Sequence, residues 1–101
     1  MQGYCKLPIN LEDIGADYMT ISSHKIHGPK GVGALYISPR IKSFPALLSG
    51  GGQESKKRAG TENLTGIVGF GKAAEIARVN FAEHVKHCSE LRDYLKDRIL
   101  N

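Results

Sequence analysis

The C-terminal part of the chain constrains its fold most, because its apolar residues recur with a helical period. Leu64, Ile67 and Val68 open an apolar face, and the pattern continues to Ile99 with a spacing close to 3.6 residues. Thr61 or Asn63 is suited to cap the start of such a helix. We therefore expect residues 62–101 to form one long helix, or two helices with a bend near residues 79 and 80.

The N-terminal part predicts strands and turns. Residues 17–22 are β-prone and are expected to form a first strand, and residues 32–38 a second. The second segment is apolar at both odd and even positions, so we expect it to be buried on both faces. A short helical turn is expected from Leu11, with Asn10 as its cap and Gly15 at its end. Residues 39–60 are rich in glycine and proline, and such a long irregular stretch is typical of a functional loop.

A polar cluster, Ser22-Ser23-His24-Lys25, follows the first strand and precedes the turn Gly28-Pro29-Lys30-Gly31. Ligands of α/β proteins collect at the carboxyl ends of strands. An amine that condenses with an aldehyde, next to hydroxyl and imidazole donors for a phosphate, suits pyridoxal phosphate (PLP) chemistry. A solvated lysine beside a simple hairpin turn is the alternative.

Composition argues against several functions. The net charge is +4, but the dense basic cluster at residues 56–58 has no interleaved aromatic residues, so we expect no nucleic-acid partner. No apolar run approaches the ~20 residues that span a bilayer, so we expect no membrane association. The two cysteines form no framework, which favours a reducing, cytoplasmic location.

The histidines near the C-terminus raise the question of a metal. His84, His87 and Cys88 have helical spacing, but a solvated helix face is the favoured interpretation, and we predict no metal site. Cys88 falls on the apolar stripe of the predicted helix. We therefore expect Cys88 to be a buried core residue rather than a reactive thiol.

The string SSHKIHGPKGVGALYI resembles the cofactor-lysine motif of class-V aminotransferase-like enzymes, the cysteine desulfurases above all. The family's Ser-x-His-Lys unit precedes Gly-Pro-Lys-Gly-x-Gly. The resemblance implies that Lys25 forms the Schiff base with PLP and that Ser22 and His24 contact the cofactor phosphate. Lys30 matches the lysine of the turn, whose role stays unassigned.

Two further blocks extend the resemblance. GGGQESKKRAGTEN is similar to the desulfurase signature, with Ala59 in place of the usual Ser and Ser55 where a basic residue is common. The resemblance implies that Thr61 reaches the cofactor phosphate of the neighbouring subunit in a homodimer. MQGYCKLPIN matches a third block, in which Gln2 would hydrogen-bond the phenolic oxygen of PLP.

The resemblance implies an α/β fold, with the chain forming part of the large PLP-binding domain of a fold-type-I enzyme. Residues 1–63 would belong to that domain, and residues 64–101 would be a helix or helix pair leading toward the small domain. The family's pyridinium-binding Asp, ring-stacking His and catalytic Cys have no counterpart in these residues. We therefore expect an internal fragment that is inactive alone.

The implied activity of the complete enzyme converts L-cysteine to L-alanine and leaves a persulfide on the enzyme. Its expected partners are L-cysteine, a sulfur-acceptor scaffold protein for Fe-S cluster or thio-cofactor assembly, and a second copy of the chain. Other class-V enzymes, such as a selenocysteine lyase or a transaminase, remain open, as does a non-catalytic truncated module. Because sheet edges and a helix face would stay exposed, we expect the chain alone to oligomerise or to be only partly ordered.

Overall fold

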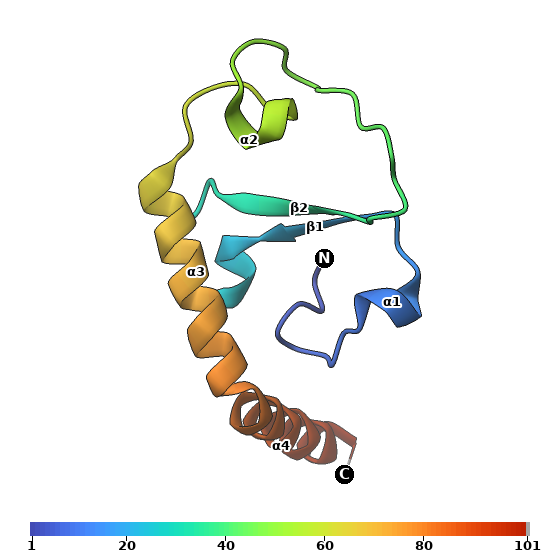
Figure 1. Ribbon diagram of the computed structural model, residues 1–101. Helices are drawn as coiled ribbons and strands as arrows, with labels where there is room; N and C mark the ends of the chain where they lie inside the picture. Colours follow the sequence, from blue (N-terminus) through green and yellow to red (C-terminus); the bar gives the residue numbers. More distant parts are fainter. Residues whose placement is uncertain (101) are drawn as a thin grey trace.

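The structure is a computed structural model that describes residues 1–100. It combines helices with a two-stranded antiparallel sheet, which confirms the predicted α/β class (Figure 1). The elements in chain order are α1 (Leu11–Ile14), β1 (Tyr18–Ser22), the 3₁₀ helix η1 (Ser23–Ile26), β2 (Gly33–Ile37), α2 (Gln53–Lys56), α3 (Leu64–Val79) and α4 (Phe81–Leu100).

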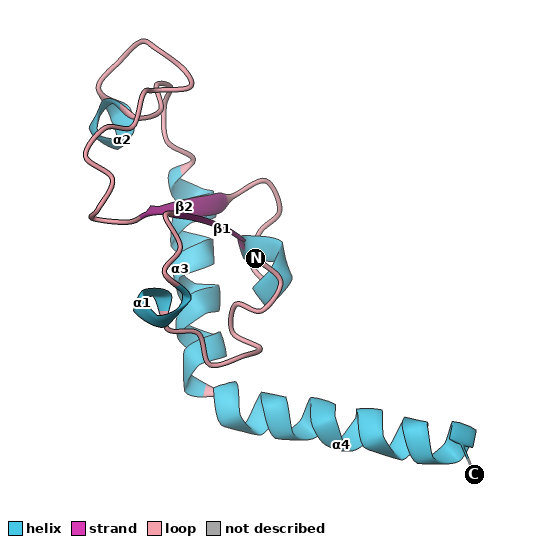
Figure 2. Ribbon diagram, turned by 90° about the vertical axis from the view of Figure 1, so that its right-hand side faces the viewer, coloured by secondary structure: helices cyan, strands magenta, loops and turns pink. Residues whose placement is uncertain are grey.

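The C-terminal helices confirm the prediction of two helices with a bend. Helix α3 begins at Leu64, where the Asn63 side-chain Oδ1 accepts a hydrogen bond from the Gly66 N–H at 3.1 Å. Helix α3 ends at Val79, and α4 starts after Asn80 and projects away at a steep angle (Figure 2). The sequence left one helix or two open, and Thr61 or Asn63 as the cap; the structure has two helices, with Asn63 as the cap of α3.

The strands pair in the register Tyr18↔Ile37 through Ser22↔Gly33. Helix α1 is capped as predicted, because the Asn10 Oδ1 accepts the Glu12 N–H at 2.9 Å. Gly15 ends this helix in the left-handed conformation, with φ 65°. The hairpin and its short preceding helix thus follow from local sequence alone.

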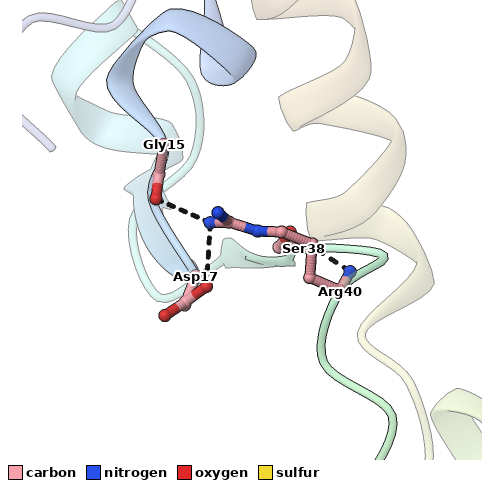
Figure 3. A network of polar contacts seen from close by, with 4 residues as sticks. All are labelled: Gly15, Asp17, Ser38 and Arg40. Carbon is pink, nitrogen blue, oxygen red and sulfur yellow. Dashed lines mark hydrogen bonds and ion pairs between the residues drawn. The ribbon is translucent and has the colours of Figure 1, made fainter.

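Arg40 joins the two ends of this hairpin (Figure 3). Its Nη2 donates to the Gly15 carbonyl at 2.7 Å and to Asp17 Oδ1 at 2.9 Å. Its Nε donates to Ser38 Oγ at 3.2 Å, and the Ser38 N–H donates to the Asp17 carbonyl at 2.8 Å. One side chain therefore connects the end of α1, the start of β1 and the end of β2.

The prediction that the second strand is buried on both faces is wrong for the described residues. Gly33, Ala34 and Leu35 of β2 are exposed, while Tyr36 and Ile37 are half-buried. Only two strands pair in this sheet, so among the described residues β2 has a neighbouring strand along one edge only. Apolar residues at both odd and even positions therefore show that a strand could be buried on both faces. They do not show that other elements pack on those faces.

The molecule is elongated rather than compact. Its radius of gyration is 17.4 Å, whereas a compact domain of this length would have about 13 Å. Helix α4 contains no buried residue. Cys88 is exposed on this helix, so the prediction of a buried core cysteine is wrong. Phe81 and Val85 of the same stripe are half-buried, so the stripe is covered only near the start of α4.

The segment 39–60 is largely irregular, as predicted, but it closes on itself. Leu48 and Arg58 form an isolated bridge, and the Ala59 N–H donates to the Leu48 carbonyl at 3.2 Å. Within it, α2 is unusual, because Glu54 and Ser55 have left-handed backbone angles, with φ of 49° and 54°. The glycine-rich loop therefore has a defined path rather than that of an open linker.

Helix α3 packs on the segment that follows β1, and its glycines allow a matched test of this packing. A Cβ at Gly69 would lie 2.6 Å from Pro29 Cγ, whereas a Cβ at Gly71 would meet nothing within 4 Å. Both substitutions by alanine gain about 1 kcal/mol of helix propensity. We expect Gly71→Ala to raise the free energy of unfolding and Gly69→Ala to lower it, measured by urea denaturation. Equal effects would show that α3 does not pack on Pro29.

Candidate functional site

The residues after β1 form a tight loop, which we call the lysine turn (residues 23–28). The Ser23 N–H donates to the Val32 carbonyl at 3.1 Å, and the Gly28 N–H donates to the Ser23 carbonyl at 3.0 Å. His27 ends the turn with a left-handed backbone (φ 65°), and its N–H also donates to the Ser23 carbonyl. One carbonyl oxygen thus accepts the two N–H groups that close the turn around Lys25.

The period of the 3₁₀ helix decides which side chains of the lysine turn are accessible. Residues three apart share a face, and Ser23 and Ile26 are both buried, with 0% and 5% exposure. This face packs against α3. His24 is consequently exposed, and Lys25 is half-buried.

Lys25 lines a pocket of about 230 Å³ between the lysine turn, the N-terminal segment and the region where α3 meets α4. Its floor is apolar, and its polar lining consists of lysine, histidine, cysteine and asparagine side chains, without a carboxylate. The lining residues are Cys5, Lys6, Lys25, Ile26, His27, Ala73, Ile76, Ala77, Asn80 and His84. Apart from Lys25, the one formally charged side chain in this lining is that of Lys6.

The hydroxyls of Ser22 and Ser23 differ in their availability. Ser22 is half-buried and precedes η1 without making a side-chain capping bond. Ser23 Oγ is buried and has no hydrogen-bond partner among the described residues, and it faces Gly28. The interpretation that both serines offer donors to a ligand is therefore wrong for Ser23, because Gly28 and α3 cover it.

These groups fit pyridoxal phosphate by their donor chemistry. Ser22 and His24 carry a hydroxyl and an imidazole at the end of a strand, and phosphate groups accept hydrogen bonds from such donors. Lys25 is a half-buried residue in a pocket whose lining contains Lys6 and no carboxylate, which suits an anionic cofactor, although Ser22 and His24 do not line this pocket.

Gln2 and Thr61 lie outside the lysine pocket. Gln2 is exposed, and the preceding Met1 amino group donates to the Thr20 carbonyl of β1 at 2.7 Å, so this segment lies beside the strand that ends at Ser22. Thr61 is exposed before the start of α3. Ala73 of the pocket is about 14 Å further along this helix than Leu64, so the chain does not bring Thr61 to its own Lys25.

The structure adds residues that sequence patterns did not connect with Lys25. Cys5 and His84 both line its pocket, and the Tyr4 beside Cys5 has a pKa raised by burial and, secondarily, by the Cys5 thiol. His84 is far from Lys25 in sequence, so no local pattern could place it there. Among residues 1–100, no group of three or more histidine, cysteine or acidic side chains is arranged to hold a metal.

Comparison with known proteins gives the family. The model for the aminotransferase class-V family matches residues 1–101, and the chain belongs to this family. The chain is 51% identical over 88 residues to the cysteine desulfurase IscS of Dictyoglomus turgidum, which covers 87% of this chain and 22% of that protein.

Solved structures agree. A NifS-like protein matches with a TM-score of 0.87 and 44% identity over 97% of this chain and 27% of its own. A structure of SspA in complex with cysteine matches with a TM-score of 0.68 and 45% identity over 73% of this chain and 22% of its own.

The chain spans about a quarter of the length of the curated relatives it matches. This share agrees with the expectation that the chain corresponds to one segment of a longer enzyme of this family. In the described residues, no helix combines the length and the apolar character needed to cross a membrane.

Proposed function

We propose that this chain is the cofactor-lysine segment of a PLP-dependent cysteine desulfurase. The observation that carries the proposal is the half-buried position of Lys25 at the end of a strand, close to the side chains of Ser22 and His24. The chain belongs to the aminotransferase class-V family, and similar members of that family are cysteine desulfurases. The complete enzyme would remove sulfur from L-cysteine, releasing L-alanine and leaving a persulfide on a cysteine thiol. The solved relative with bound cysteine supports that substrate.

The proposed residues divide into one reactive amine and the groups that would hold the cofactor. Lys25 would hold the cofactor through Nζ, and the same amine would hold or move a proton during the reaction. Ser22 and His24 would bind the phosphate, and Gln2 would hydrogen-bond the phenolic oxygen of the ring. Bound PLP supplies an electron sink for carbanionic intermediates.

Thr61 would act in the partner subunit of a homodimer. Its exposed position, away from the Lys25 pocket of its own chain, supports a role in trans. Residues 1–63 would form part of the large PLP-binding domain, and residues 64–101 would lead toward the small domain. In the complete enzyme, a sulfur-acceptor scaffold protein in the cytoplasm would receive the persulfide sulfur.

Covalent capture of PLP tests the proposal without requiring the complete enzyme. Incubation with PLP and borohydride reduction are expected to place the pyridoxyl mass on the peptide that contains Lys25, detected by mass spectrometry. Lys25→Ala should lose most of the trapped cofactor, while Lys30→Ala, a matched exposed lysine in the next turn, should retain it. Equal labelling of all three proteins would overturn the assignment of Lys25.

The homodimer proposal has a separate test. Exposed apolar side chains on α4, such as Leu91, Leu95 and Ile99, favour association in water. Size exclusion with light scattering is expected to give a mass of at least twice 11.0 kDa. A sharp monomeric peak over the micromolar range would contradict self-association of this chain.

A further inference from the structure

His27 occupies a costly backbone position directly beside the proposed cofactor lysine. Its φ of 65° lies in the left-handed region, which is unfavourable for residues other than glycine, although histidine is among the more tolerant. In this conformation its N–H closes the lysine turn on the Ser23 carbonyl. The path of the backbone around Lys25 therefore depends on what holds His27 in place.

The His27 side chain has a partner in another element. Its ring meets the ring of His84 edge to face, with centroids 6.4 Å apart and an interplanar angle of 82°. His84 belongs to the first turn of α4, where its N–H donates to the Asn80 carbonyl at 2.9 Å. Lys25, His27, Asn80 and His84 all line the same pocket.

This contact connects the orientation of α4 with the lysine turn. Helix α4 has no fully buried residue, and only a few of its side chains, such as Phe81 and Val85, are half-buried. A change at the bend would displace His84 and remove the ring that faces His27. We propose that His27 is a positioning residue for Lys25, supported by His84, so that the direction of α4 tunes the reactivity of the lysine.

The inference rests on the proposed role of Lys25 but goes beyond it. It adds a coupling between the lysine turn and a helix that begins 55 residues later in the sequence, from Ile26 to Phe81. Lys25 on the lysine turn and Cys5 and Lys6 on the N-terminal segment line the pocket that holds the two imidazoles. On α4, Glu83 and His87 line a hollow with His84, and the Cys88 Sγ is 3.7 Å from His84 Nε2.

The test measures trapped PLP at Lys25 and, independently of the cofactor, the rate of Lys25 methylation by formaldehyde and cyanoborohydride. An edge-to-face ring contact corresponds to about a two- to tenfold change in an equilibrium constant. His27→Asn, which tolerates the left-handed backbone, and His84→Ala should each change both readouts by about this factor. The double variant should show no further change, because one contact is lost in all three.

Two further variants separate positioning from general damage to the fold. His84→Phe retains a ring and should restore values close to those of the unmodified chain. His87→Ala removes another α4 histidine that does not line the Lys25 pocket, and it should have no effect.

The outcomes distinguish this inference from the proposed function. If PLP does not label Lys25 preferentially, the proposed function fails, while the methylation rates still decide the coupling. Additive effects of the two histidine substitutions, or unchanged methylation in both single variants, would overturn the positioning role of His27. A loss in His84→Phe as large as in His84→Ala would overturn it as well.

Discussion

Replacing Gly28 by alanine is expected to lower the free energy of unfolding by about 2–3 kcal/mol and to reduce PLP trapping at Lys25. The new Cβ would overlap the buried Ser23 hydroxyl, and it would lie 3.0 Å from Ala73 Cβ and 3.2 Å from the Ser23 carbonyl oxygen. Those atoms belong to the lysine turn and to α3, so the turn must open or move off the helix. Urea denaturation and mass spectrometry of the trapped adduct measure the two effects.

A second substitution identifies the cause. Ser23→Ala alone removes a buried hydroxyl without a partner and is expected to raise stability by about 1 kcal/mol. In that background, Gly28→Ala should cost clearly less, because the Oγ that it meets is gone. Gly52→Ala is the matched control, since a Cβ there meets nothing within 4 Å and its φ is negative. An equal cost of Gly28→Ala in both backgrounds would contradict the contact.

Replacing Phe70 by alanine is expected to cost about 3–5 kcal/mol, the usual loss for a buried aromatic side chain. Phe70 on α3 and Ile26 on the lysine turn are the buried hydrophobic residues of the described chain. Folded domains are commonly stable by only 5–15 kcal/mol, so this loss would be a large share of the stability of the fold. We expect a lower urea midpoint and weaker PLP trapping at Lys25.

Val68→Ala provides the control for Phe70. Val68 is on the same helix but is 63% exposed, so we expect its change in stability to stay within about 0.5 kcal/mol. Circular dichroism at increasing urea concentration compares the two variants directly. Similar midpoints for Phe70→Ala and Val68→Ala would show that the packing of α3 on the lysine turn contributes little.

The sequence predicted those features that depend on neighbouring residues. Asn10 and Asn63 cap their helices through their own side chains, and Gly15 ends α1, because capping involves groups only a few residues apart. The bend at Asn80 and the irregular path of residues 39–60 were predicted for the same reason. The position of Lys25 at a strand end was visible in the sequence, and its proposed role came from family resemblance.

The sequence could not predict features that depend on which segments meet. Neighbouring Ser22 and Ser23 have the same side chain, but only Ser23 is closed off by Gly28 and α3. Cys88 has the spacing of a core residue, yet it is exposed, because spacing along a helix does not decide which segments pack against it. The first three residues of β2 are likewise exposed, and Tyr36 and Ile37 are only half-buried, since burial depends on the layers that pack against a strand.

By itself, then, the sequence determined the helices, the hairpin, the family and the lysine that we propose carries the cofactor. The tertiary structure alone decided the surroundings of that lysine. Its pocket is lined both by Cys5, near the N-terminus, and by His84, in the C-terminal helix. The physical reason is the range of the interactions. Hydrogen bonds within a turn are set by adjacent residues, whereas a contact such as that between His27 and His84 exists only once distant helices are placed in space.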